Sequence, residues 1–269
     1  GDRGLMWVDS HCHLDFPELA ADRDGLIARA VAAGLQSVVT ISTRVRRFDG
    51  IRAIAEAHDG IWCSVGTHPH NAHEELDVTA DDLVRLADHP KVIAIGEAGL
   101  DYFYDKSPRE AQEQGFRTHI AAARSSGLPL VIHAREADEK VAAILTEEMG
   151  KGAFKAVLHC FTGSRELALH GVELGLYVSF SGIATYKSAA NLRELAAELP
   201  ADRILVETDA PYLAPGKFRG KTNEPSYVVE TGRIIAEARG VTPDEMARQT
   251  TGNFYRLFAK ADPGRHLSA

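Results

Sequence analysis

Apolar residues along the chain gather into short runs bounded by glycine, proline and charged residues, and the runs recur at regular intervals. Runs of this length and setting are typical of buried β-strands. The pattern predicts eight strands, at Met6–His13, Ser37–Ser42, Ile61–His68, Val92–Gly99, Pro129–Ala134, Lys155–Phe161, Leu176–Gly182 and Ile204–Asp209. Amphipathic segments between them predict helices, among others at Asp24–Ala33, Glu110–Ser125, Ala137–Glu147, Ser188–Leu199 and Tyr227–Arg239.

Strict alternation of strand and helix predicts a parallel sheet with right-handed crossovers, and eight repeats close a (β/α)8 TIM barrel. The alternative is an open doubly wound sheet, but no glycine-rich phosphate-binding fingerprint follows the first strand. A chain of 269 residues suits one barrel domain, which we expect over residues 6–260. Residues 1–5 are expected to be a leader or a cloning remnant, and residues 261–269 a frayed tail. The segment Thr242–Glu245 combines an N-cap threonine with proline at the first helical position, and so predicts a helix start.

Residue types that bind divalent metals follow several of these apolar runs. They are His11 and His13 on the first predicted strand, Glu97 on the fourth, His133 on the fifth, His159 on the sixth and Asp209 on the eighth. Because the carboxyl ends of barrel strands meet at one mouth, these side chains are expected to converge there. The alternative, a set of hydrogen-bonded core residues, would bury charged groups together at high cost. The sequence therefore predicts a metal-dependent hydrolase.

Two divalent ions fit this set better than one, since a carboxylate can bridge an ion pair and Glu97 is the natural bridge. One ion would take His11, His13, Glu97 and Asp209, and the other would take Glu97, His133 and His159. Both sets leave open positions for water and substrate. Two divalent cations, two carboxylates and one hydroxide sum to about +1, which suits an anionic ester such as a phosphodiester. Zn²⁺, Mn²⁺, Fe²⁺ and Mg²⁺ all remain candidates, and a single bound ion is the alternative.

Further polar residues at the strand ends are candidates for catalysis and substrate binding. Glu207 shares a strand face with Asp209 and is expected to orient a ligand or pass a proton, although a salt-bridged core glutamate is the alternative. His68 and His70 could contact phosphate oxygens or protonate a leaving group, with a surface-loop role as the alternative for one of them. The remaining candidates for substrate binding are Arg135 as an anion clamp, Thr162 as a hydroxyl donor, and Arg219 and Lys221 beside an aromatic ring. A solvated charged loop is the alternative for the last two.

Composition and charge narrow the possible partners. A formal charge of −8 argues against broad, charge-driven coating of nucleic acid, but not against a nuclease whose positive charge is local and supplied by bound metal. No apolar stretch approaches a membrane span, and no secretory signal is visible. Three cysteines are too few, and odd in number, for a disulfide framework. We therefore expect a cytoplasmic monomer with no membrane partner.

Seven motifs, in order along the chain, resemble those of TatD-type metal-dependent deoxyribonucleases. They are Asp9–Leu14, Gly66–His70, Ile95–Asp101, His133–Arg135, His159–Gly163, Glu207–Tyr212 and Arg219–Pro225. The resemblance covers residues 6–260 and implies an amidohydrolase-like barrel, two divalent metal ions and 3′-exonuclease hydrolysis of DNA, at single-stranded ends, by metal-activated hydroxide. It also supports the six metal ligands expected above. Thr222 stands where many members of this family carry arginine, which leaves one cation fewer near the mouth.

A second enzymatic hypothesis is an amidohydrolase or deaminase that acts on a small cyclic amide or nucleoside at the same metal site. The common two-ion form of those enzymes carries a carboxylated lysine at the end of the fourth strand. This chain has Glu97 at that place, which favours the nuclease. Fold alone does not separate the two hypotheses.

Overall fold

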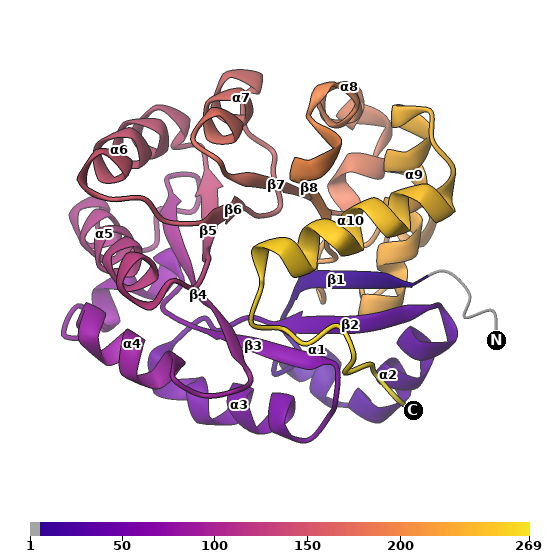
Figure 1. Ribbon diagram of the computed structural model, residues 1–269, viewed down its shortest axis with the longest axis horizontal. Coiled ribbons are helices and arrows are strands. Elements are labelled where there is room, and N and C mark those ends of the chain that lie inside the picture. The colour runs from indigo at the N-terminus through magenta and orange to yellow at the C-terminus, as the bar shows by residue number, and fades with distance from the viewer. Residues whose placement is uncertain (1–5) are drawn as a thin grey trace.

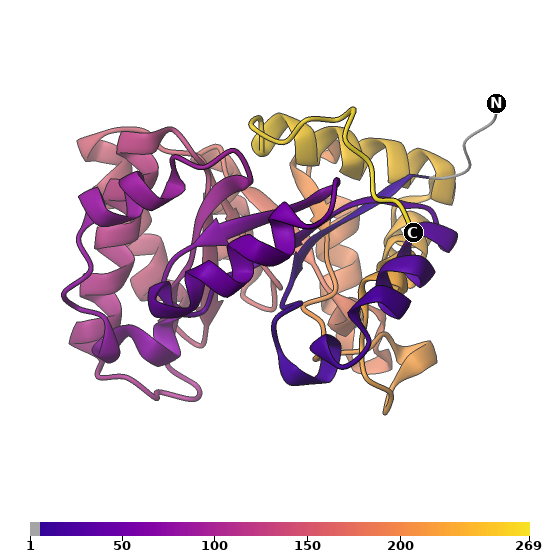
Figure 2. The same cartoon turned by 90° about the horizontal axis from the view of Figure 1, so that it is seen from below.

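The computed structural model describes residues 6–269, so the expectation for residues 1–5 lies outside the described part of the chain. Eight parallel strands form one sheet in chain order and curve into a barrel, with helices around the outside (Figures 1 and 2). The strands are β1 Trp7–Cys12, β2 Leu35–Thr40, β3 Ile61–Val65, β4 Val92–Asp101, β5 Leu130–Arg135, β6 Ala156–Leu158, β7 Tyr177–Phe180 and β8 Ile204–Val206. The predicted (β/α)8 barrel is confirmed.

The helices occupy the intervals between strands, close to the predicted ranges. They are α1 Pro17–Ala20, α2 Arg23–Ala32, α3 Phe48–Glu56, α4 Ala80–Ala87, α5 Arg109–Ser126, α6 Asp138–Lys151, α7 Arg165–Glu173, α8 Ala190–Glu198, α9 Val228–Arg239 and α10 Pro243–Leu257. Short 3-10 turns lie at Val45–Arg47, Pro69–Glu74, Gly182–Thr185, Lys187–Ala189, Ala201–Arg203, Gly216–Phe218 and Pro225–Tyr227. The predicted start of α10 is confirmed, because the Thr242 hydroxyl accepts a hydrogen bond from the Glu245 backbone N–H at 3.1 Å. In the described residues no helix is both long enough and apolar enough to cross a membrane.

Several strands differ from their predicted bounds: β3, β6 and β7 end two or three residues earlier than predicted, and the differences at β8 and β4 shape the mouth of the barrel. β8 ends at Val206, and Asp209 adopts a left-handed backbone with φ of 56°, which aspartate tolerates better than most residues. β4 continues two residues beyond the prediction, because it pairs with β5 as far as Asp101 and Arg135. Gly99 makes this pairing possible: a Cβ there would lie 2.1 Å from the His133 carbonyl oxygen, and its φ is 143°.

The barrel closes at its carboxyl end through bonds between β1 and the chain just after β8. The Asp209 N–H donates to the His11 carbonyl at 2.8 Å, and the His13 N–H donates to the Ala210 carbonyl at 2.9 Å. Beside them the buried Asp9 carboxylate accepts from the Thr208 hydroxyl at 2.6 Å and the Thr208 N–H at 2.9 Å. The buried backbone groups of the seam and the Asp9 carboxylate therefore have hydrogen-bond partners, as burial requires.

The inside of the barrel is filled by apolar side chains from the strands and plugged at the amino-terminal end by α10, which crosses the strands in Figure 1. This interior cluster comprises Val8, Val39, Ile41, Trp62, Ile93, Ala94, Val131, Val157, Tyr177, Leu205, Phe254, Leu257, Phe258 and Ala261. A larger apolar layer joins the outer faces of the strands to the helices. The two ends of the barrel therefore differ. The amino-terminal end is closed by apolar packing, and the polar carboxyl end stays open.

The tail after Lys260 packs against the barrel instead of fraying, contrary to the expectation for residues 261–269. Leu267 is buried, and its N–H donates to the Gln36 carbonyl at 2.9 Å. Gly60 permits this approach, since a Cβ there would lie 2.4 Å from the Leu267 nitrogen. In Figure 1 the yellow tail runs from α10 across β2 and β3. The polar residues 262–265 suggested fraying, but the apolar anchor lies beyond them.

We expect Leu267→Ala to lower the free energy of unfolding by about 2 kcal/mol, because it empties a buried site. Urea unfolding followed by circular dichroism measures the change. Ser268→Ala, at an exposed neighbour, is the control and should leave the free energy of unfolding unchanged. Equal stability of the two variants would show that the tail contributes nothing to the fold.

Candidate metal centre

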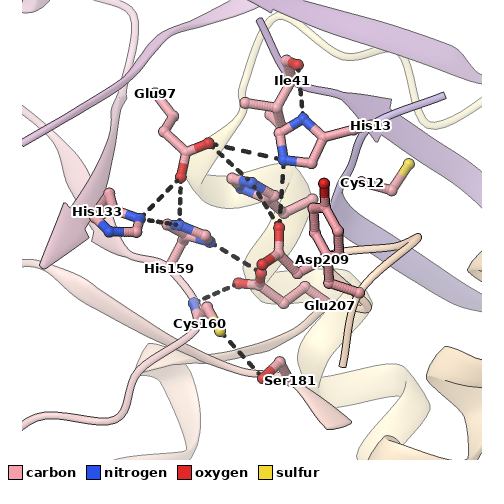
Figure 3. Close-up of polar contacts among 12 residues, drawn as sticks. Cys12, His13, Ile41, Glu97, His133, His159, Cys160, Ser181, Glu207 and Asp209 are labelled. Atoms are coloured by element: carbon pink, nitrogen blue, oxygen red, sulfur yellow. Dashed lines mark hydrogen bonds and ion pairs between the residues drawn. The ribbon is translucent and has the colours of Figure 1, made fainter. Parts of the chain in front are cut away.

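The six residue positions expected to bind metal come together at the carboxyl end of the barrel. His11 lies within β1, Glu97 within β4 and His133 within β5; His13, His159 and Asp209 lie just past the ends of their strands. Figure 3 shows most of these side chains pointing toward one another around Glu97. Two groups of side chains that could hold an ion share this residue: His11 with His13 and Glu97, and Glu97 with His133 and His159. Within each group the ligand atoms lie within 4.8 Å of one another.

On the β1 side, two imidazoles face two carboxylates. His13 donates from Nδ1 to the Ile41 carbonyl at 3.1 Å, which directs Nε2 inward (Figure 3). That Nε2 lies 3.3 Å from Asp209 Oδ1 and 3.8 Å from Glu97 Oε1. His11 Nε2 lies 3.4 Å from Asp209 Oδ1 and 3.5 Å from Glu97 Oε1. The arrangement presents nitrogen and oxygen donors to one point, as a divalent ion requires.

On the opposite side of Glu97, two further imidazoles approach its second oxygen. His159 Nε2 lies 2.5 Å from Glu97 Oε2, and His133 Nδ1 lies 3.4 Å from the same atom. The rear nitrogen of His159, Nδ1, is 3.0 Å from Glu207 Oε2, while the other Glu207 oxygen accepts from the Cys160 N–H at 2.8 Å. The buried Glu207 therefore fixes the direction of the His159 ring, a partner arrangement typical of metal-binding histidines.

Three buried polar atoms of the centre have no hydrogen-bond partner among residues 6–269: both ring nitrogens of His11 and Oε1 of Glu97. Such orphaned groups are costly in a protein interior. Imidazole nitrogens and carboxylate oxygens are donors that divalent ions of the zinc, manganese and iron type accept. The residues present therefore fit a bound metal ion.

The charges of the centre are strongly coupled. Burial alone would raise the pKa of Glu97, but the neighbouring imidazoles, His159 first, hold it well below its ordinary value. Burial likewise opposes ionisation of Asp209, whose pKa is nevertheless lowered, chiefly by its hydrogen bond with His13. Burial lowers the pKa of His68 well below its ordinary value, so this ring is neutral near pH 7.

Asp101 is a member of the site to which no role was given from the sequence. Its Oδ2 lies 2.8 Å from His133 Nε2 and 3.0 Å from His70 Nε2, while Oδ1 accepts from backbone N–H groups in the following loop. These histidine contacts hold its pKa well below the ordinary value despite burial. His133 thus has Asp101 behind it, as His159 has Glu207. The sequence signal that could have identified Asp101 as a site residue is its position at the end of the Ile95–Asp101 motif.

The residues expected to bind substrate are only partly brought together. A cavity of about 980 Å³ opens beside the centre, and its lining includes His133, Arg135, His159, Thr162 and Asp209. The structure places the two loop cations elsewhere: they are absent from this lining, and the Arg219 guanidinium lies over the Tyr186 ring, 4.3 Å from its centroid.

Comparison with known proteins agrees with this geometry. The family described as TatD related DNase matches residues 8–259. The chain is 42% identical to the uncharacterized metal-dependent hydrolase YabD of Bacillus subtilis, over 94% of this chain and 99% of the relative. It is 36% identical to the protein named 3′-5′ ssDNA/RNA exonuclease TatD of Enterobacter lignolyticus, over 94% and 99%.

A solved structure repeats the same fold. The crystal structure of YjjV, a TatD homologue from Escherichia coli K12, superposes with a TM-score of 0.87 at 31% identity, covering 94% of this chain and 98% of that one. Family match, sequence identity and shared fold point the same way. The chain belongs to the TatD family of metal-dependent hydrolases.

Proposed function

We propose that this protein is a two-ion deoxyribonuclease that hydrolyses phosphodiester bonds from single-stranded 3′ ends of DNA. The observation that carries the proposal is the division of Glu97 between two imidazole pairs. Oε1 faces His11 and His13 at 3.5 and 3.8 Å, whereas Oε2 faces His133 and His159 at 3.4 and 2.5 Å. A carboxylate shared in this way suits a bridging ligand between two ions.

Nucleic acid as the substrate class is supported by the printed name of the relative from Enterobacter lignolyticus, which includes both single-stranded DNA and RNA. In our proposal, His11, His13, Glu97 and Asp209 hold one ion, and Glu97, His133 and His159 hold the other. When bound, such ions supply Lewis-acid stabilisation of the developing oxyanion charge and make hydroxide available as the nucleophile near neutral pH.

The other residues of the site then have separate tasks. Glu207 positions His159, and with Asp209 it can accept a proton from the attacking water. His68 is neutral near pH 7, so its ring can donate one hydrogen bond to a phosphate oxygen. Arg135, at the wall of the cavity, is placed to bind phosphate with two parallel hydrogen bonds.

His70, Thr162, Arg219 and Lys221 complete the proposed substrate contacts. His70 is fixed by Asp101, and Thr162 presents an exposed hydroxyl beside the cavity. Arg219 and Lys221 lie exposed on the loop after β8. There they can contact the part of the DNA strand that lies farther from the reacting phosphate.

We expect Glu97→Ala to abolish DNA cleavage, with a loss of at least about a thousandfold, because it removes the shared ligand of both ions. The assay uses 3′-labelled single- and double-stranded DNA with Mg²⁺, Mn²⁺ or Zn²⁺, beside RNA, nucleosides and cyclic amides. Glu173→Ala is the control, since that glutamate is 82% exposed on α7. Turnover of a nucleoside or amide, with no DNA cleavage by the wild type under any metal, would replace the nuclease with the amidohydrolase or deaminase hypothesis.

The ion count gives a second prediction. Wild-type protein loaded with Mn²⁺ or Zn²⁺ and dialysed should retain two ions per chain, and His133→Ala should retain one, since His133 belongs to only one ligand set. Inductively coupled plasma mass spectrometry measures the metal concentration, and division by the protein concentration gives the number of ions per chain. His170→Ala on α7 controls for the loss of a histidine outside the centre. A ratio of one in the wild type would contradict the shared role of Glu97.

Glu207→Gln should weaken metal binding by about 10–100-fold while the fold stays intact. The wild-type carboxylate accepts from both the His159 ring and the Cys160 N–H. An amide can accept from one of them only, and its NH2 group then opposes the other donor. Calorimetric titration of metal-free protein with Mn²⁺ measures the affinity, and unfolding curves check the fold. Unchanged affinity would show that Glu207 does not position His159.

A further inference from the structure

The most exposed large apolar side chains of the described chain stand at the mouth of the barrel. Phe103 and Tyr104 follow β4 and are 51% and 52% exposed; Tyr212 follows β8 and is 53% exposed. Large aromatic side chains seldom stay this exposed together unless the surface binds something. These rings lie at the open end of the barrel, on the same side as the metal centre.

Asp101 ties the β4 pair of rings to the metal centre. Its Oδ1 accepts from the N–H groups of Phe103 and Tyr104 at 3.0 and 2.8 Å. Its Oδ2 contacts His133 and His70, as described above. One buried carboxylate therefore fixes both the backbone that carries the two rings and the positions of the two histidines. The aromatic surface is held in register with the reacting centre.

Arg135 adds positive charge to this surface, in which the Phe103 and Tyr104 rings meet edge to face with centroids 4.9 Å apart and planes at 90°. The guanidinium lies 4.1 Å from the centroid of the Phe103 ring and 5.1 Å from that of Tyr104. The Lys106 ammonium is 5.5 Å from the Tyr104 ring. An arginine stacked on aromatic rings, with a lysine nearby, offers flat faces to a base and cations to its phosphate.

On the other side of the mouth a second row of rings leads outward from the centre. The rings of His13 and Phe16 stack with centroids 4.6 Å apart, and the Phe16 and Tyr212 rings meet edge to face at 6.0 Å. Burial, then Glu18, Asp209 and Tyr104, raise the pKa of Tyr212.

We propose that Phe103, Tyr104 and Arg135 form a stacking site for one unpaired nucleobase next to the scissile phosphodiester, in which the base stacks on one ring and meets the perpendicular ring beside it. This inference rests on the proposed nuclease function and deepens it. A base can lie against these faces only after it leaves its own stack and its pairing partner. The site would therefore select single-stranded ends over duplex ends, independently of base identity.

The test compares variants that remove a ring with variants that keep it. Phe103→Leu and Tyr104→Leu should each raise KM for a single-stranded oligonucleotide about tenfold with little change in kcat. Phe103→Tyr and Tyr104→Phe, which preserve the flat face, should retain the wild-type KM. Melting curves of all four variants confirm that they are folded.

A second set of substrates identifies the base. A stable abasic analogue replaces the nucleotide at each of the last three positions of the 3′ end in turn. With the abasic analogue at the position whose base stacks, the KM of the wild type should rise to that of the leucine variants. The leucine substitutions should then raise KM no further on that substrate. If the leucine variants kept a tenfold higher KM than the wild type at every abasic position, the proposal would be overturned. The rings would then affect KM without contacting a base.

The outcomes separate this inference from the function on which it rests. Cleavage by the wild type with unchanged KM in both leucine variants overturns the stacking site and leaves the nuclease standing. Should the wild type cleave no DNA, fluorescence anisotropy with a labelled single-stranded oligonucleotide decides, and equal affinity of wild type and leucine variants overturns the stacking site. A change from dimer to monomer on ring removal, with unchanged DNA affinity, would also overturn it and assign the surface to a second copy of the chain.

Discussion

The site depends on the contacts between the buried carboxylate of Glu97 and the imidazoles around it. At 1% exposure this carboxylate has lost nearly all contact with water, a loss of several kcal/mol for a lone ion, so it requires compensating positive charge or bonded hydrogens. Imidazoles from β1, β5 and β6 and from the loop after β3 supply that compensation. In this chain, residues so distant in sequence surround one carboxylate because the parallel strands that carry them end in one ring. The barrel is therefore a condition for the site as well as its support.

Closure of the barrel and placement of a candidate ligand use the same backbone atoms. The Asp209 N–H bonds the His11 carbonyl across the seam, so both residues are positioned by one hydrogen bond. Asp9, two residues before His11, accepts both bonds from Thr208, one residue before Asp209. Because the seam is made of the neighbours of these side chains, loosening it would displace them together.

Much of this arrangement was predictable from the sequence, because strand periodicity and the place of each histidine or carboxylate after a strand are local properties. Asp101 was not predictable in its role, since its partners depend on the register that sets Gly99 opposite His133 and Asp101 opposite Arg135. The burial of Leu267 against the barrel was not predictable for a similar reason. Its neighbours, Gln36 and Gly60, are more than two hundred residues away, and the polar stretch before it resembles a loose end.

The charge of the whole chain and the charge of the mouth act over different distances. A formal charge of −8 repels a polyanion at long range, but salt screens that repulsion beyond about 8–10 Å. In the proposed nuclease, attraction then comes from groups in contact with the substrate: the bound metal ions, Arg135 and the exposed rings. Contact between ring faces and bases is insensitive to screening, unlike phosphate contacts. Under the proposed nuclease function, an acidic chain therefore gains most from exposed aromatic rings at the open end of the barrel, where Phe103 and Tyr104 stand.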